Sequence, residues 1–282
     1  MRAYRYRLLN VFTIDGDRFS GNPLCVFEDA RTLTDAEMQS IALQFNLSET
    51  TFILPSETAT ARVRIFTPSF EMPFAGHPTL GTAHVVRALL GAGDEITLEM
   101  KAGVIPVRAS GDTWALTARP PSYRDVEATT AQLTETLGLR PGDVREGARW
   151  VDTGSLQLVV PLASTDALAR CKPTPELLRK LATTPDRRPL AYAIADDGER
   201  ETPVRFFFLK GNQVVEDPAT GSACANLGGW LLGRGARLPL GRTVRQGSFV
   251  GRPSRLFLRV DAERQIEVRG EVIEFGTGVI RL

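Results

Sequence analysis

A phrase that occurs twice, half a chain apart, is the strongest constraint on how these 282 residues can fold. The segment His77-Pro78-Thr79-Leu80-Gly81-Thr82-Ala83 corresponds to Asp217-Pro218-Ala219-Thr220-Gly221-Ser222-Ala223. Proline, glycine, a hydroxyl residue and alanine occupy the same places in both copies, and a side chain that can carry a proton begins each one. A repeat of this kind predicts two similar halves, each with the same local structure at the repeated phrase.

Each copy of the phrase has the features of a helix start. Proline fits the first turn of a helix, so we expect Pro78 and Pro218 to begin helices. Neither residues 78–86 nor residues 218–233 include Asp, Glu, Lys or Arg. A helix without charged side chains belongs in the interior of a protein. The sequence therefore predicts two central buried helices, each wrapped by strands.

The two helix starts are candidate binding sites. A helix N-terminus offers N–H donors and a partial positive charge, which suits a substrate carboxylate. His77 and Asp217, expected just outside the helices, are candidates for proton transfer. The residues expected to contact the substrate are Gly76, Pro78, Thr79, Gly221 and Ser222. Two structural alternatives stay open, because Asp217 is also a good helix cap and a histidine in this place can have a purely structural role.

Composition excludes several classes of function. The content is 43% hydrophobic and 24% charged, which is ordinary for a globular protein of one large or two medium domains. The net charge of +1 gives no reason to expect a nucleic-acid or membrane partner. No apolar run is long enough to span a membrane, and the first residues lack the apolar core of a secretion signal.

Cysteine and histidine usage narrows the expectations further. Three dispersed cysteines, Cys25, Cys171 and Cys224, form no disulfide framework, so we expect a cytoplasmic protein with reduced thiols. With two histidines and no paired cysteine motif, we expect no metal site. The chain also lacks the glycine-rich loops that bind phosphates and dinucleotides, and we expect no cofactor. His84 and Cys224, which lie inside the apolar helices, are interpreted as core residues.

The predicted elements follow the same order in both halves: strands, a helix, more strands, a buried helix, and more strands. This order is typical of an α+β protein rather than of regular βαβ units. Arg119-Pro120-Pro121-Ser122 interrupts the pattern and predicts domains at 1–120 and 121–282, with the last strand, near 272–282, able to return to the first domain. Outside the repeated phrase, helices are expected near 35–45, 128–137, 164–170 and 175–181.

Glu49 is the third candidate for proton transfer. It lies in Asn46-Leu47-Ser48-Glu49-Thr50-Thr51-Phe52, between a predicted helix end and a predicted strand. Leu47 and Phe52 are apolar, so we expect the carboxyl in a low-dielectric environment, where it can serve as a general acid or base. A surface glutamate in a connecting segment is the alternative. The chain has no Gly-x-Ser-x-Gly motif that would favour a serine nucleophile.

These phrases resemble the PhzF-like family, named for a phenazine-biosynthesis isomerase, which shares its fold with diaminopimelate epimerase. The matching phrases extend over nearly the whole chain: Gly21-Asn22-Pro23, the Glu49 segment above, Phe66-Thr67-Pro68, Gly76 to Ala83, Glu216 to Ala223, Gln246-Gly247 and Gly251-Arg252-Pro253-Ser254. The resemblance implies two pseudo-symmetric domains, each a barrel-like, mostly antiparallel sheet around a central helix. It also implies an active site between the domains, and a homodimer.

The resemblance assigns roles as well. It implies that Glu49 moves a proton and that His77, Asp217 and Ser222 line the site. The expected function is therefore a cofactor-independent isomerase that moves a proton on a small carboxylate-bearing substrate. Two alternatives remain open: a catalytically silent binding protein of the same fold, and a cofactor-independent amino-acid epimerase or racemase.

The chain departs from its relatives at three places. The segment Arg205–Gln213 replaces a phrase with proline and glycine, which puts the substrate in doubt. Gln44 stands where relatives often have an acidic residue. The first cysteine of the pair used by diaminopimelate epimerases would fall near Ala75, so two-thiol chemistry is excluded.

Overall fold

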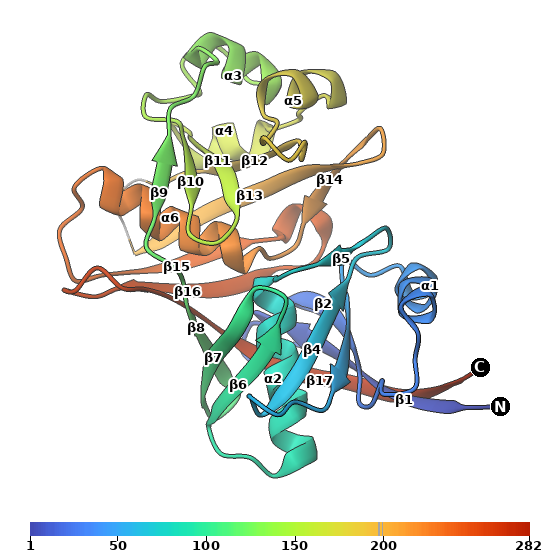
Figure 1. Ribbon diagram of the computed structural model, residues 1–282. Coiled ribbons are helices and arrows are strands. Elements are labelled where there is room, and N and C mark those ends of the chain that lie inside the picture. Colours follow the sequence, from blue (N-terminus) through green and yellow to red (C-terminus); the bar gives the residue numbers. More distant parts are fainter. Residues whose placement is uncertain (197, 199) are drawn as a thin grey trace. The chain divides into compact units, whose positions relative to one another are not determined.

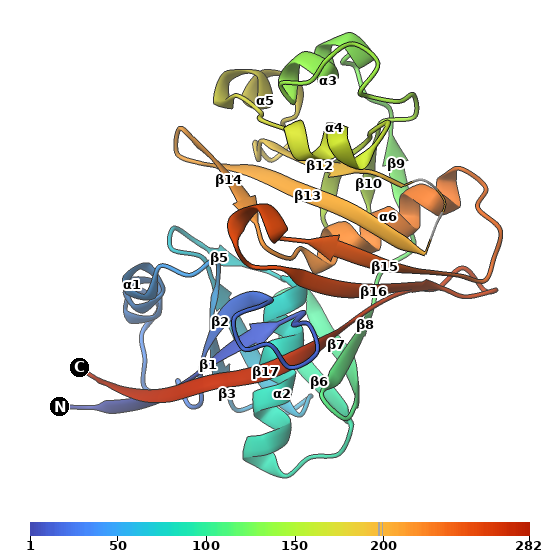
Figure 2. The same ribbon diagram turned by 180° about the vertical axis from the view of Figure 1, so that it is seen from behind.

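In the computed structural model, which describes residues 1–196, 198 and 200–282, the chain divides into two units. Unit 1 consists of residues 1–117 and 269–282, and unit 2 consists of residues 118–268. The end of the last strand therefore belongs to the same unit as the N-terminal residues. Figures 1 and 2 show the two units from opposite sides.

Unit 1 is a closed barrel. Of the strands that the structure describes, eight form the ring β17–β1–β2–β3–β4–β6–β7–β8, and β8 pairs with β17 to close it. Most of these pairings are antiparallel, whereas β2–β3 and β4–β6 are parallel. The bounds are β1 (Ala3–Val11), β2 (Asn22–Phe27), β3 (Thr50–Leu54), β4 (Ala61–Phe66), β5 (Glu71–Met72), β6 (Glu95–Met100), β7 (Gly103–Ser110), β8 (Thr113–Thr117) and β17 (Ile266–Arg281).

Helix α2 (Gly76–Leu90) fills the barrel of unit 1 and contacts all the ring strands from β1 to β8 (Figure 1). Its first eight residues are all buried, as expected for a stretch without charged side chains, and Arg87 lies in its last turn. Helix α1 (Asp35–Phe45) lies outside the ring. It begins with a capping box formed by Thr34 and Glu37 and ends at Asn46, which adopts the left-handed conformation.

Unit 2 repeats the topology of unit 1. In unit 1 the successive pairings β1–β2, β2–β3, β3–β4, β4–β6 and β6–β7 alternate between antiparallel and parallel. The pairings β10–β11, β11–β12, β12–β13, β13–β15 and β15–β16 follow the same sequence. The bounds are β9 (Ser122–Arg124), β10 (Arg149–Asp152), β11 (Leu156–Pro161), β12 (Leu190–Ile194), β13 (Glu201–Lys210), β14 (Gln213–Asp217), β15 (Leu240–Gln246) and β16 (Ser254–Val260).

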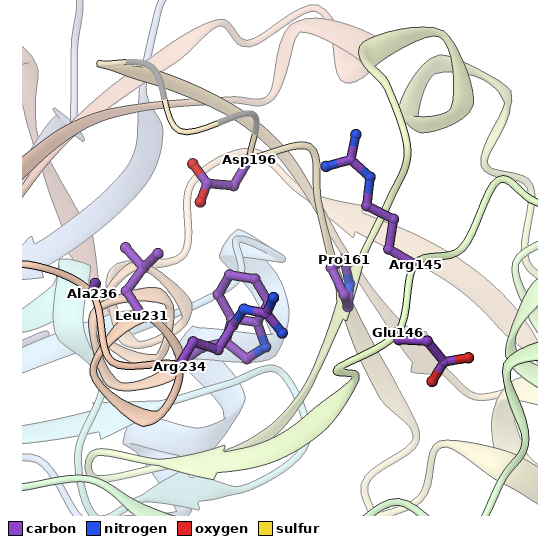
Figure 3. A pocket seen from close by; sticks show the side chains of 8 residues that line it. Arg145, Glu146, Pro161, Asp196, Leu231, Arg234 and Ala236 are labelled. Atoms are coloured by element: carbon purple, nitrogen blue, oxygen red, sulfur yellow. The ribbon is translucent and has the colours of Figure 1, made fainter.

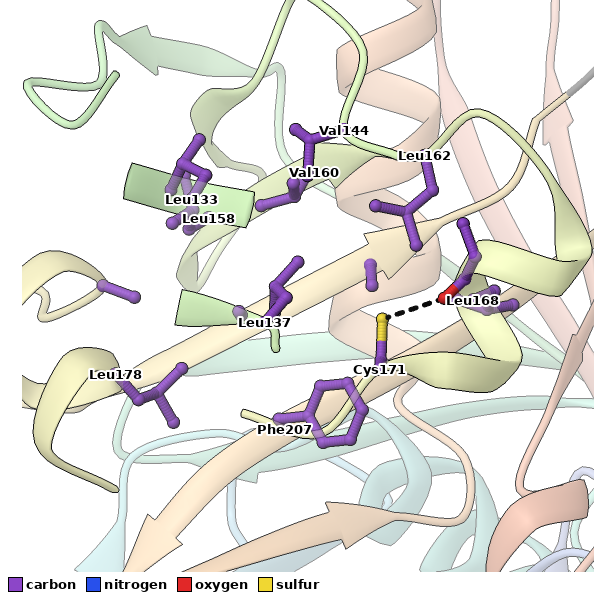
Figure 4. Close-up of a cluster of buried hydrophobic side chains, with 14 of the residues drawn as sticks. Leu133, Leu137, Val144, Leu158, Val160, Leu162, Leu168, Cys171, Leu178 and Phe207 are labelled. Atoms are coloured by element: carbon purple, nitrogen blue, oxygen red, sulfur yellow. Dashed lines mark hydrogen bonds between the residues drawn. The ribbon is translucent and has the colours of Figure 1, made fainter. Parts of the chain in front are cut away.

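The sheet of unit 2 has helices on both faces (Figure 2). Helix α6 (Gly221–Gly233) packs against β10, β11 and β16, and Gly229 permits a close approach, because an added Cβ would lie 2.9 Å from Val151. The other face carries α3 (Thr130–Thr136), α4 (Thr165–Arg170) and α5 (Pro175–Leu181). Leucines from these helices pack with Phe207 of β13 in a buried cluster (Figure 4).

The expected two-unit α+β fold is confirmed, as are the helices near 35–45, 128–137, 164–170 and 175–181. The expected helix starts are wrong in detail. Helix α2 begins at Gly76, which puts His77 and Pro78 inside its first turn, because Thr79 N already donates to Ala75 O.

The second helix start differs in the opposite direction. Helix α6 begins at Gly221, three residues after Pro218, because Asp217 is still paired with Phe206 in the sheet. The N-cap of α6 is Thr220, so Asp217 does not cap this helix.

Candidate functional site

Glu49 lies immediately before β3, where the chain has left helix α1 through the left-handed Asn46. Its side chain is only 15% exposed. The neighbouring Phe52 is fully buried, and Leu47 packs against the same aromatic cluster. The side chain of Glu49 is therefore largely buried, which disagrees with the alternative of a surface glutamate in a connecting segment.

His77 is the second residue of α2, and its side chain is 6% exposed. Its Nε2 atom lies 3.5 Å from Glu49 Oε2. Nε2 has no aligned hydrogen-bond partner among the described residues, so this contact is close but is not a well-formed hydrogen bond. Unit 1 thus brings together two of the three residues expected to take part in proton transfer.

The imidazole of His77 is neutral around pH 7. Burial lowers its pKa to about 3, and a hydrogen bond with the backbone of Pro23 opposes this shift only in part. On the other side of the ring, Nδ1 lies 3.5 Å from Asn22 Nδ2. The pair formed by Glu49 and His77 is therefore a carboxyl group beside an uncharged imidazole, not a salt bridge.

Local sequence fixes this arrangement. Gly21 has a φ of +80°, and an added Cβ would lie 2.6 Å from Val11 O, so only glycine fits before Asn22. A hydrogen bond of 2.8 Å joins the hydroxyls of Thr51 in β3 and Thr82 in α2. The strand that follows Glu49 is thus tied to the helix that carries His77.

In unit 2, Asp217 is the last residue of β14 and is 9% exposed. Its Oδ2 atom accepts a hydrogen bond of 2.6 Å from Thr220 Oγ1. Its backbone carbonyl accepts a hydrogen bond of 2.8 Å from the side-chain amide of Gln246. The aspartate is therefore held by contacts to its side chain and to its backbone.

Ser222 is the second residue of α6, and it anchors a chain of amides. Its Oγ atom accepts a hydrogen bond of 2.9 Å from Gln157 Nε2, and Gln157 Oε1 accepts one of 2.7 Å from Asn226 Nδ2. Asn226, fully buried in α6, accepts hydrogen bonds from the backbone and hydroxyl of Thr153. This network fixes Ser222 in the first turn of α6, the place expected from the sequence.

Several residues of these clusters escape the sequence analysis. Asn22 and Gln246 lie in phrases that carry the family resemblance, so the sequence singles them out but does not indicate what they do. Gln157 and Asn226 give no sequence signal, because they lie far apart in the chain and meet only through the packing of α6 on β11. Cys224 is fully buried, as expected, and burial raises the pKa of its thiol. His84 is only half-buried, and its Nδ1 atom accepts a hydrogen bond from Trp114.

A cavity of about 270 Å³ opens elsewhere in unit 2, at the C-terminal end of α6 (Figure 3). Trp230, Leu231 and Arg234 of this end line it together with Asp196 and Arg145. The indole of Trp230 donates to Gly147 O, and Asp196 faces Arg242 at 3.5 Å. The cavity contains none of the expected site residues, and Gly221 and Ser222 lie at the other end of the helix.

The fold and these clusters define a class of proteins: two repeated α+β units, each with a buried central helix that presents polar groups at its first turn. The chain matches the family described as phenazine biosynthesis-like protein, PhzC-PhzF, over residues 9–278. It belongs to this family.

Relatives with assigned names point to one class of enzyme. The chain is 40% identical to an uncharacterized isomerase of Pasteurella multocida, with 99% of this chain and 94% of the relative covered. It is 35% identical to the trans-2,3-dihydro-3-hydroxyanthranilate isomerase of Pseudomonas aeruginosa, with 98% of both chains covered. The expected enzyme class, an isomerase, is confirmed by these names.

Solved structures agree with the fold. A PhzF-family phenazine biosynthesis protein of Bacillus anthracis superposes with a TM-score of 0.85 at 25% identity, over 100% of both chains. A hydroxyproline epimerase of Agrobacterium vitis superposes with a TM-score of 0.65 at 15% identity, over 99% of this chain and 91% of that one. The second likeness concerns the fold alone. None of the helices in the described part of the chain has the length and hydrophobicity of a membrane-spanning segment.

Proposed function

We propose that this protein is a cofactor-independent isomerase that moves a proton between two positions of a small carboxylate-bearing substrate. The observation that carries the proposal is the pair formed by Glu49 and His77, whose Oε2 and Nε2 atoms lie 3.5 Å apart in a buried environment. A carboxylate can take a proton from carbon and, once protonated, can give one back, and a neutral imidazole beside it does not hold it in an ion pair.

In this mechanism Glu49 is the group that touches the reacting carbons. As a carboxylate it removes a proton from one carbon of the substrate, and as a carboxylic acid it returns a proton to another carbon. The substrate gains and loses one proton, so the reaction needs no oxidant and no second reactant. His77 stays neutral throughout, and its Nε2 atom, 3.5 Å from Glu49 Oε2, orients the carboxyl group that carries the proton.

The remaining groups bind the substrate in this proposal. The N–H groups of the first turn of a helix have no partners within the helix, and they favour an anion. In α2 these donors are Gly76 and His77, since Pro78 has none, and in α6 they include Gly221 and Ser222. Asp217 and Ser222 add a carboxylate and a hydroxyl that can orient an amine or hydroxyl group of the substrate.

The substrate class follows from the anion-binding groups and from a relative. The named isomerase of Pseudomonas aeruginosa, 35% identical over 98% of both chains, acts by its name on trans-2,3-dihydro-3-hydroxyanthranilate, a ring carboxylate. This compound is therefore the first to test. We expect turnover of this compound or of a related ring carboxylate.

Thermal shift tests the carboxylate requirement without turnover. At ten times its Kd a ligand adds about 1.4 kcal/mol to stability, which raises Tm by about 2–4 °C in a protein of this size. We expect 3-hydroxyanthranilate to produce such a shift. Its carboxamide should need at least about ten times the concentration for the same shift, because it loses one charge-assisted contact. Equal shifts with acid and amide, together with no turnover of any ring carboxylate, would contradict the proposal.

A further inference from the structure

The segment from Asp217 to Thr220 crosses from the end of β14 to the start of α6, and the side chain of Gln246 holds it at both ends. Gln246 is 2% exposed. Its Nε2 atom donates to Asp217 O at 2.8 Å and to Thr220 Oγ1 at 2.9 Å, and its Oε1 atom accepts from Thr220 N at 3.1 Å. These three hydrogen bonds of the amide are thus all made to one four-residue segment.

The amide also fixes the direction of the next hydrogen bond. An amide nitrogen can only donate, so Thr220 Oγ1 accepts from Gln246. The hydroxyl proton of Thr220 is then directed at Asp217 Oδ2, 2.6 Å away. The result is a one-way chain from Gln246 through Thr220 to one oxygen of the Asp217 carboxylate.

The residue after Gln246 locks the backbone against the same segment. Gly247 has a φ of +80°, and an added Cβ would lie 2.4 Å from Pro218 O and 2.2 Å from Arg252 O. Any side chain here would push the two backbones apart. The Gln246-Gly247 phrase therefore fits the Asp217–Thr220 segment through both its side chain and its backbone.

A buried ion pair supports the segment from the other face of the sheet. Glu216 accepts two hydrogen bonds from Arg205, at 2.6 and 3.1 Å, and the two side chains are 7% and 10% exposed. Arg205 also donates to the backbone carbonyls of Leu168 and Cys171 at the end of α4. Its guanidinium stacks on Phe249, which follows Gly247, at 4.3 Å from the ring centre. Gln246 thus contacts Asp217 directly, and Phe249 contacts Arg205, the partner of Glu216.

We infer that Gln246 and Thr220 are positioning residues that orient the carboxylate of Asp217 for the reaction. The inference rests on the proposed function, since it takes Asp217 to contact the substrate. It explains why the phrase Gln246-Gly247 occurs together with the Asp217 phrase, although about thirty residues separate them. It also gives Gln246 and Thr220 a role in the reaction.

The test replaces the hydroxyl of Thr220 and compares the result with a matched site. Thr220→Val keeps the shape of the side chain but removes the donor to Asp217. We expect kcat to fall about 10- to 100-fold, with KM changed by less than about threefold. Thr220→Ser, which keeps the hydroxyl, should restore kcat to within about threefold of the wild type.

Thr184 provides the control. It is 2% exposed, its hydroxyl donates to Asp186 Oδ1 at 2.5 Å, and the hydroxyl accepts from Arg188 N at 2.9 Å. Thr184→Val therefore removes an equivalent threonine–aspartate contact outside the proposed site, and we expect its kcat to match that of the wild type. A Thr220→Val enzyme with wild-type kcat, or one no slower than Thr184→Val, overturns the inference. If Thr220→Val does not fold, Thr220→Ala serves in its place.

A crystallographic comparison separates this inference from the proposed function. The Asp217 carboxylate should keep its orientation in Thr220→Ser, whereas in Thr220→Val its χ1 angle should change by more than the roughly 30° that separates conformers within one rotamer. An unchanged carboxylate in Thr220→Val overturns the positioning role even if kcat falls. If the wild type turns over no ring carboxylate, the proposed function fails, and the crystal structures still decide whether Thr220 orients Asp217.

Discussion

Replacing Glu49 by glutamine should lower kcat roughly 10²–10⁴-fold, the range that a positioned acid–base group contributes. Glutamine has nearly the same shape as glutamate, but it cannot take a proton from carbon. The Glu49 side chain is 15% exposed and faces the neutral imidazole of His77, so the substitution breaks no salt bridge between these two residues. We therefore expect substrate binding and the free energy of unfolding to change little, and a steady-state assay with a parallel urea titration measures both effects.

Glu28 offers a matched control for Glu49. Its side chain is 17% exposed in the same unit, and it accepts a hydrogen bond of 2.7 Å from Arg7. Glu28→Gln loses a structural ion pair, so it should lower stability slightly and leave kcat within about twofold of the wild type. A Glu49→Gln enzyme that retains more than about a tenth of wild-type kcat would show that another group removes the proton.

The second large effect is the dependence of stability on pH through His77. Its pKa is about 3 in the folded protein and about 6.5 in an unfolded chain. As the pH falls below about 6.5, the unfolded chain takes up a proton and the folded protein does not, so stability is lost progressively until about pH 3. The contribution lost is about 2 kcal/mol at pH 5 and about 3 kcal/mol at pH 4.

The titration of His77 can be followed directly, because the sequence has only two histidines. In His84→Gln, whose lost side chain accepts a hydrogen bond from Trp114, the remaining imidazole signal belongs to His77. We expect this NMR signal not to shift between pH 8 and pH 5. A titration with a midpoint near 6.5 would mean that His77 is charged at mildly acidic pH, and it would remove the neutral imidazole from the mechanism.

The sequence could predict the elements that carry the repeat, because the same local signals occur in both halves. Proline, small residues and the absence of charge identified both buried helices, and the phrase around Glu49 placed it between a helix and a strand. The exact helix starts could not be predicted in this way. The two copies of the phrase differ in what precedes the helix. His77 already lies in α2, whereas Asp217 still pairs with Phe206 in the sheet. Three residues then separate Asp217 from α6, and Gln246 bonds both Asp217 and the last of the three, Thr220.

The amide networks could not be predicted for a different reason. The side chain of Gln157 supports Ser222 only because β11 packs against α6, and Gln246 reaches Asp217 only because the end of β15 lies near the end of β14. Such contacts depend on strand order, which the periodicity of the sequence does not determine. The contact between His77 and Asn22 could not be predicted for the same reason, since it joins the start of β2 to the start of α2.

The most direct measurement of the central claim is a mass-spectrometric count of carbon-bound deuterium after the reaction runs to equilibrium in D₂O. While Glu49 holds the proton within a turnover, this proton can exchange with solvent, so repeated turnover by the wild type should incorporate deuterium from D₂O into substrate and product, whereas Glu49→Gln should incorporate essentially none over the same time. Deuterium incorporated by Glu49→Gln as fast as by the wild type would show that another group carries the proton, and proton transfer through Glu49 would be disproved.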